Sequence, residues 1–161
     1  MPTTSIFDIP YPDPTDRPSA SQLRAIAEAL EAALVAVGQV EETTSGAVPP
    51  ASGWQVNSFQ AIRIGRVCTV RYEALRSGTA WPIVNDELGM GPNGNFADET
   101  VGTLPAGWRP VTLINTVWGT GSIGGECTIN TSGVISLRSG VPTGVVNTNN
   151  IVRVSASYVL Q

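Results

Sequence analysis

The chain has 161 residues, and its hydrophobic share of 42% is that of a globular protein with room for one domain and an appendage. It has a formal net charge of -4 and no lysine, which argues against nucleic acid and acidic lipid surfaces as partners. It also has no histidine, so histidine-based serine, zinc and cysteine hydrolases are excluded, and we expect no metal and no cofactor.

Residues 1–18 predict an extended arm. Pro10, Pro12, Pro14 and Pro18 fix their own φ angles, lack an N–H group and push the preceding residues toward extended conformations. The apolar side chains of the arm then have no local core to enter, so we expect them to dock on another protein. A disordered tail is the alternative. The predicted docking residues are Ile6, Phe7, Ile9, Pro10, Tyr11, Pro12 and Pro14.

The start of the arm has neither the basic residues nor the apolar run of a signal peptide. No segment of the sequence reaches membrane-spanning length. We therefore expect the chain to be made in a cytoplasm and not to insert into a membrane.

Residues 19–38 predict a helix over 20–37, with Ser19 and Gln22 as a capping box and Gly38 as the stop. Apolar side chains recur at a 3-4-3-4 spacing, which is typical of a coiled coil and leans toward trimers or tetramers. A helix packed on its own domain gives the same pattern, but the oligomer is favoured because the arm before the helix and the linker after it leave the helix isolated in sequence. The predicted oligomerisation residues are Leu23, Ile26, Leu30, Ala33 and Val37.

Residues 39–53 are small and polar and predict a linker, and the module from 54 to 161 follows it. Many glycines and prolines among Val, Ile, Thr, Ser and Asn indicate short strands joined by tight turns. The expected fold is mainly β, with a β-sandwich or jelly-roll knob. The predicted strands cover 59–64, 67–75, 111–118, 126–130, 134–139 and 150–160.

Cys68 and Cys127 each lie inside a strand-like run, without the paired spacing that zinc or redox chemistry needs. Two buried free thiols are favoured, and a disulfide between them stays open.

The stretch 80–100 is predicted to be the longest irregular segment of the β module, and long loops are often functional. Its aromatic side chains stand among amides and carboxylates, a combination that suits sugar recognition. For each aromatic residue taken singly, packing against the core of the knob is the favoured alternative. The candidate glycan-binding residues are Trp81, Asn85, Asp86, Asn93, Asn95 and Phe96.

Two carboxylate pairs, Asp86-Glu87 and Asp98-Glu99, could in principle form the acid and base of a glycosidase. Side chains adjacent in sequence usually point apart, and carboxylates in loops are mostly solvated. We therefore expect a protein that is not an enzyme.

Three stretches of the β module carry a family resemblance: "AIRIGRVCTVRYEAL" (61–75), "VGTLPAGWRPVTLI" (101–114) and "CTINTSGVISL" (127–137). In this order they resemble the C-terminal knobs of tailed-bacteriophage fibre and receptor-binding proteins. Residues 104–110 are similar to the Leu-Pro-x-Gly-aromatic-Arg-Pro turn of that family, and residues 128–133 to its Thr-Ile-x-x-x-Gly hairpin. The arm that runs into "AIAEAL" also resembles the start of phage tail and head-fibre proteins.

The resemblance implies a trimeric structural protein of the virion, assembled in the host cytoplasm and exposed on the particle surface. Its arm would attach to the major capsid protein or to a tail protein, and its knob would display a face for host glycans. Because the chain is short, with no long shaft, a head decoration or head fibre is the first hypothesis. The alternatives are a tail fibre or receptor-binding protein that recognises host carbohydrate, and a carbohydrate-active enzyme.

Overall fold

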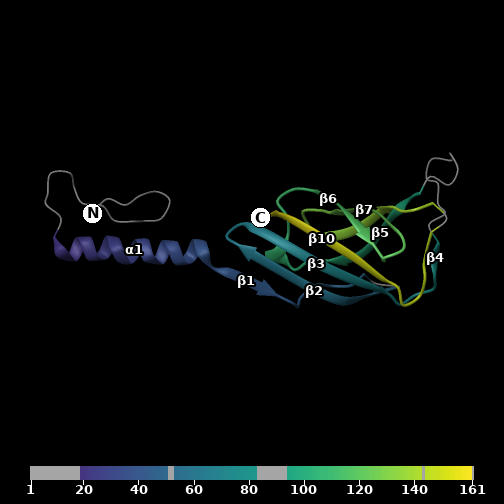
Figure 1. Cartoon of the computed structure of the whole chain (residues 1–161), viewed down its shortest axis with the longest axis horizontal. Helices are drawn as coiled ribbons and strands as arrows, with labels where there is room; N and C mark the ends of the chain where they lie inside the picture. Colours follow the sequence, from purple (N-terminus) through teal and green to yellow (C-terminus); the bar gives the residue numbers. More distant parts are fainter. Residues whose placement is uncertain (1–18, 51–52, 83–93, 143, 161) are drawn as a thin grey trace. The chain divides into compact units, whose positions relative to one another are not determined.

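A computed structural model of the chain describes residues 19–50, 53–82, 94–142 and 144–160, with only the backbone described at 36 and 37. The chain divides into two compact units, Met1–Val40 and Glu41–Gln161. In the first unit the described part is dominated by helix α1 (Ala20–Gly38), and the second is built on a curled antiparallel sheet (Figure 1).

Helix α1 begins at the capping box that the sequence predicts. The N–H of Gln22 donates to Oγ of Ser19 at 3.3 Å, and the N–H of Ser19 donates to Oε1 of Gln22 at 2.7 Å. These two bonds satisfy backbone donors that a helix start otherwise leaves without a partner. The helix ends before Gln39, whose backbone is extended. The predicted helix over 20–37 is confirmed.

Helix α1 exposes much of its apolar stripe. Leu23 and Leu30 are 54% and 48% exposed, and Ile26 and Ala33 are half-buried. The side chain of Val37 lies outside the described part. The proposed trimer along this stripe stays a prediction.

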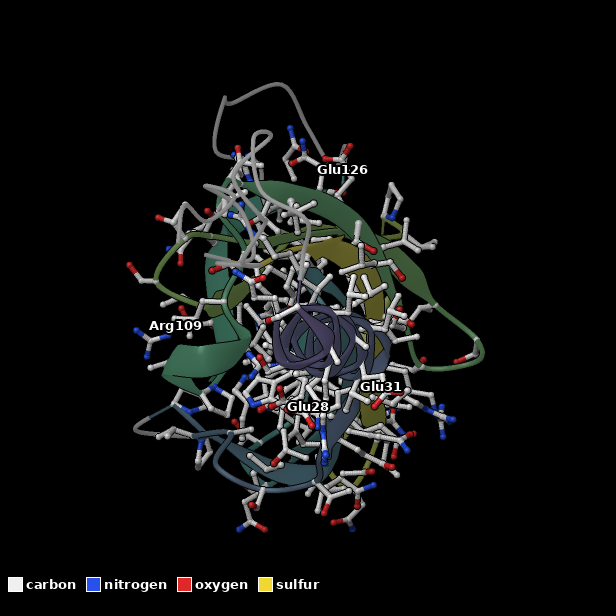
Figure 2. The ribbon with its side chains drawn as sticks, turned by 90° about the vertical axis from the view of Figure 1, so that its left-hand side faces the viewer. Glu28, Glu31, Arg109 and Glu126 are labelled. Atoms are coloured by element: carbon white, nitrogen blue, oxygen red, sulfur yellow. The ribbon has the colours of Figure 1, made fainter. Side chains whose placement is uncertain are left out.

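The polar surface of α1 carries several charged side chains. Nε of Arg24 lies 2.8 Å from Oε1 of Glu28, an ion pair one helical turn apart. Glu28 and Glu31 project outward from the helix (Figure 2). Since a stripe of apolar side chains accompanies these charges, α1 is amphipathic.

The unit Glu41–Gln161, here called the knob, is mainly β, as predicted. Eight strands form one sheet in the order β1-β2-β3-β10-β6-β7-β8-β5, and β4 and β9 form a separate pair. The described pairings from β2 through to β5 are antiparallel. The strands are β1 (Val40–Thr43), β2 (Trp54–Ile64), β3 (Val67–Arg76), β4 (Trp81–Pro82), β5 (Asn95–Thr103), β6 (Ile114–Gly119), β7 (Gly124–Ile129), β8 (Val134–Ser139), β9 (Val145–Val146) and β10 (Ile151–Val159).

The strands differ from the sequence prediction at the sheet edges. Residues 40–43, expected to belong to a linker, form β1, and residues 95–103 form β5, so the irregular stretch is shorter than 80–100. β1 is mostly exposed, and the pairing of β5 with β8 is interrupted by two register shifts. Both strands therefore lack the alternation of apolar and polar residues by which strands are recognised.

The two edges of the sheet approach each other because the sheet curls (Figure 1). Val48 and Thr103 exchange two backbone hydrogen bonds of 2.9 and 2.8 Å, which join the segment after β1 to the end of β5. Inside the curl, Oη of Tyr72 in β3 donates to the carbonyl oxygen of Val101 in β5 at 2.7 Å. The result is a half-barrel whose concave side holds the core.

The core is filled by alternate side chains of the long strands. In β3, Val70, Tyr72 and Ala74 are fully buried, whereas Arg71 between them is exposed. The same alternation places Val152 and Val154 of the neighbouring β10 inside. Inward-facing residues from both halves of the curl thus meet in one core.

Both cysteines are free and buried, which confirms the favoured interpretation and excludes the disulfide in this structure. Burial raises the pKa of the Cys127 thiol to about 12. Burial is also the largest cause that raises the pKa of Cys68. Neither thiol is poised to react as a thiolate near neutral pH.

Candidate binding surfaces of the knob

The predicted docking residues of the arm, Ile6, Phe7, Ile9, Pro10, Tyr11, Pro12 and Pro14, lie outside the described residues. Their role stays a prediction. Among the described residues, no helix has the length and apolar character that crossing a bilayer demands. No group of three or more potential metal-ligating side chains was found within that same part of the chain.

Two of the predicted glycan-binding residues, Trp81 in β4 and Phe96 in β5, are brought together by the fold. Their ring centroids lie 4.7 Å apart with an interplanar angle of 79°, an edge-to-face contact. Phe96 is only 4% exposed and Trp81 is half-buried. Phe96 therefore supports Trp81 and offers no open face to a sugar. Glycan binding at Trp81 stays a prediction.

The structure describes only one of the other predicted glycan-binding residues. Asn85, Asp86 and Asn93 lie outside the described residues. Asn95 is exposed at the start of β5, opposite Ser139 of β8.

Three further side chains complete an aromatic cluster with Trp81 and Phe96: Trp54 and Arg76, which the sequence analysis did not single out, and Glu99, which it considered only as a catalytic carboxylate. The ring of Trp54 lies 6.2 Å from that of Trp81, and the guanidinium of Arg76 lies 5.0 Å from the Trp54 ring. Nε1 of Trp54 donates to Oε1 of Glu99 at 2.7 Å, and Nη1 of Arg76 lies 3.6 Å from the same oxygen. Each partner comes from a different strand, so no spacing within the sequence predicts the group.

This aromatic cluster fixes both stems of the segment between Pro82 and Gly94. Trp81 stands just before the segment and packs against Trp54, whereas Phe96 stands just after it, packs against Trp81 and is itself part of the core. The side chain of Arg76 is only 12% exposed, so its interactions with Trp54 and Glu99 are poorly screened by water. The contacts of the cluster therefore join β2, β3, β4 and β5 at this side of the knob.

The carboxylates that were considered for glycosidase chemistry are used otherwise. Glu99 belongs to the aromatic cluster, and Oδ1 of Asp98 lies 3.1 Å from Nε of Arg138. Side chains of neighbouring strand residues point to opposite faces of a sheet, so these two carboxyl groups do not flank a common site. Asp86 and Glu87 lie outside the described residues.

The motif turn 104–110 is joined to the β7–β8 hairpin by short-range contacts. The N–H of Leu104 donates to the carbonyl oxygen of Gly133 at 2.9 Å, and Nε of Arg109 donates to the carbonyl oxygen of Leu104 at 3.2 Å. Gly133 has a φ of 83°, and a Cβ there would lie 2.9 Å from Cγ of Arg109. Glycine is needed at the hairpin both for its backbone angle and for this close approach.

The same turn is joined to β2 and β10. The guanidinium of Arg63 lies 5.3 Å from the ring of Trp108, and its Nη1 donates to the carbonyl oxygen of Gly107 at 3.3 Å. Oη of Tyr158 donates to the carbonyl oxygen of Trp108 at 2.7 Å. The three stretches that carry the family resemblance therefore meet at one end of the knob. Their motif residues hold the backbone in place.

Comparison with known proteins found similarity among solved structures but not by sequence. No family model and no curated protein matches the sequence. Among solved structures, the chain is similar to the crystal structure of the receptor-binding protein gp15 of Listeria phage PSA. The TM-score is 0.43 and the sequence identity 14%, over 88% of this chain and 81% of that chain. A likeness of this size carries no inference about what the chain binds.

Proposed function

We propose that this chain is a virion protein of a tailed bacteriophage whose knob contacts the host cell surface. The observation that carries the proposal is the meeting of residues 61–75, 101–114 and 127–137, which resemble phage fibre and receptor-binding knobs. These stretches are separate in sequence, yet Arg63, Leu104 and Gly133 take part in one connected set of contacts. Motif residues that depend on one another in space support a shared fold better than three independent matches would.

The arrangement of the chain fits attachment through several copies. Leu23 and Leu30 expose an apolar stripe on α1 that a homotrimer would cover. If three chains associate, their arms engage the virion together, and avidity raises the strength of attachment without any new contact. The partners of the arm would be the major capsid protein or a tail protein.

Receptor binding on the tail is preferred here to decoration of the head. The knob resembles fibre and receptor-binding modules, and no described residue favours attachment to the capsid over receptor binding on the tail. A carbohydrate-active enzyme is less suitable, because Asp98 and Glu99 are each bound to an arginine and lie on opposite faces of β5.

Two measurements test the proposal. Purified full-length chain, added to host cells before infection, is expected to bind the cells and slow phage adsorption. Immunogold labelling of virions with an antibody against the knob is expected to mark the tail. Label spread over the head would support the decoration hypothesis instead, and a chain that neither binds cells nor affects adsorption would contradict the receptor-binding role.

A further inference from the structure

The outer face of the knob carries polar side chains in a row that runs across four strands. Thr100 of β5 lies opposite Ser136 of β8, Ser136 opposite Thr128 of β7, and Thr128 opposite Asn115 of β6. The strand neighbours of Thr128 and Ser136 are fully buried, so these two side chains point away from the core. Thr128 itself is only 8% exposed, so the accessible polar groups of the row are the amide of the exposed Asn115 and the partly exposed hydroxyls of Ser136 and Thr100.

A charged row runs beside the polar row. Asp98 of β5 is paired with Arg138 of β8 at 3.1 Å. Glu126 of β7 lines the same hollows as Arg138, and its side chain points outward from the sheet (Figure 2). Among the described residues the carboxylate of Glu126 has no hydrogen-bond or ion-pair partner, although its backbone N–H donates to Oγ of Ser139 at 3.1 Å. One carboxylate therefore remains free to accept hydrogen bonds from a ligand.

Two hollows of about 220 Å³ each lie on this part of the surface and share two lining residues. Asn115 and Thr128 contribute to the first, Asn95 and Asp98 contribute to the second, and both are lined by Glu126 and Arg138. We call the two hollows together the sheet groove. It crosses β6, β7, β8 and β5, a width of three strand spacings or about 14 Å, which suits an oligosaccharide better than a single sugar.

We propose that the sheet groove binds a neutral saccharide chain. Sugar hydroxyls both donate and accept hydrogen bonds, and the groove offers acceptors at Glu126, donors at Arg138, and an amide with both at Asn115. Asp98 and Glu126 outnumber Arg138, so a phosphate-bearing or otherwise anionic chain is disfavoured. Val117, opposite Glu126 and 69% exposed, provides an apolar contact for the C–H groups of a sugar.

The lining of the sheet groove also favours a saccharide over a protein partner. Protein interfaces draw most of their binding energy from buried aromatic or arginine anchors in a desolvated centre. Here the only arginine, Arg138, is already paired with Asp98, and the one aromatic residue, Phe96, is buried. The inference rests on the proposed function, since the host surface is where such a chain would be met, and it places the contact on the sheet rather than on the aromatic cluster.

The test uses the full-length chain on an array of bacterial surface glycans that includes neutral and phosphate-bearing chains. Wild type is expected to bind neutral chains. Glu126→Gln and Asn115→Ala should each weaken this binding by about tenfold, the effect of losing one hydrogen bond to a charged or well-placed polar group. Glu31→Gln makes the same charge change on α1 as Glu126→Gln and should leave binding unaltered. Thermal unfolding of each variant checks that the knob remains folded.

The outcomes separate this inference from the proposed function. Equal binding by wild type and the two groove variants, or binding confined to phosphate-bearing chains, overturns the sheet groove as the site. If wild type binds host cells while Glu126→Gln and Asn115→Ala bind them equally well, the receptor-binding role survives and the groove inference fails. If wild type binds neither glycans nor cells, both fail.

Discussion

Replacing Gly102 with alanine tests whether the two halves of the curled sheet meet as described. Gly102 lies in β5 directly against Tyr72 of β3, and an added Cβ would overlap with the hydroxyl and the ring of that tyrosine. The ring is fully buried and its hydroxyl is bound to the carbonyl oxygen of Val101 at 2.7 Å. Tyr72 therefore cannot move aside without losing this hydrogen bond.

The expected cost of Gly102→Ala combines overpacking with the loss of a buried hydrogen bond. Together they should lower the free energy of unfolding by about 2 to 5 kcal/mol. Urea unfolding followed by the fluorescence of the buried Trp54 and Trp118, at one fixed protein concentration, measures the change. Gly107→Ala is a matched control, because a Cβ at that position meets nothing within 4 Å and should cost little or nothing.

A double variant separates the overlap from any intrinsic preference for glycine at this position. Tyr72→Leu removes the ring and hydroxyl, at a cost of its own of about 2 to 4 kcal/mol for the cavity left behind. Adding Gly102→Ala to this background should then cost less than about 1 kcal/mol, because the overlapping atoms are gone. Equal costs in both backgrounds would show that the two strands do not approach each other at this point.

Three further predictions concern single side chains. Glu99→Gln should lower the free energy of unfolding by about 1 to 3 kcal/mol, because Arg76 is only 12% exposed and loses its charged partner. Asp98→Asn breaks an exposed ion pair and should cost less than about 1 kcal/mol, and thermal unfolding of both variants measures the difference. Burial raises the pKa of the Cys127 thiol from its ordinary value of 9.0 to about 12, so the contribution of this thiol to stability is complete below pH 9.0. Between pH 9.0 and about pH 12 the free energy of unfolding should fall by about 1.4 kcal/mol per pH unit on account of this group. Cys127→Ala should remove the contribution of this thiol to the slope. Ser19→Ala should destabilise α1 by about 1 kcal/mol, seen as lost helical circular dichroism, and an unchanged signal would contradict the role of the cap.

Local patterns were enough to predict α1 and the hairpins. The capping box at Ser19 and the alternation from Val67 to Arg76 each involve residues close in sequence, so the signal is complete within one segment. The β7–β8 hairpin was predicted for the same reason, because Gly133 marks its turn. The edge strands β1 and β5 were missed, since exposure in one and register shifts in the other remove the period of two.

The candidate sites depend on strand order, which no local pattern contains. Trp54 meets Trp81, and Arg76 meets Glu99, only because the sheet curls until β2 and β5 come together. Trp81 and Phe96 could be singled out as aromatic residues beside amides. Their packing against each other, with Phe96 in the core, required the position of β5 to be known.

The residues on which the family resemblance rests differ from the residues whose side chains are available to bind a ligand. Gly133 lies against Arg109 of the motif turn, and Arg109 bonds to Leu104 within that turn, so substitution of either residue should disturb folding more than it changes what the knob binds. Glu126 and Asn115 stand at outward positions of two strands, where many side chains support the same backbone. Such positions can change without loss of the fold. A knob of this kind can therefore keep its turn motif while its sheet groove adapts to different saccharides, and specificity has to be sought on the strands between the motifs.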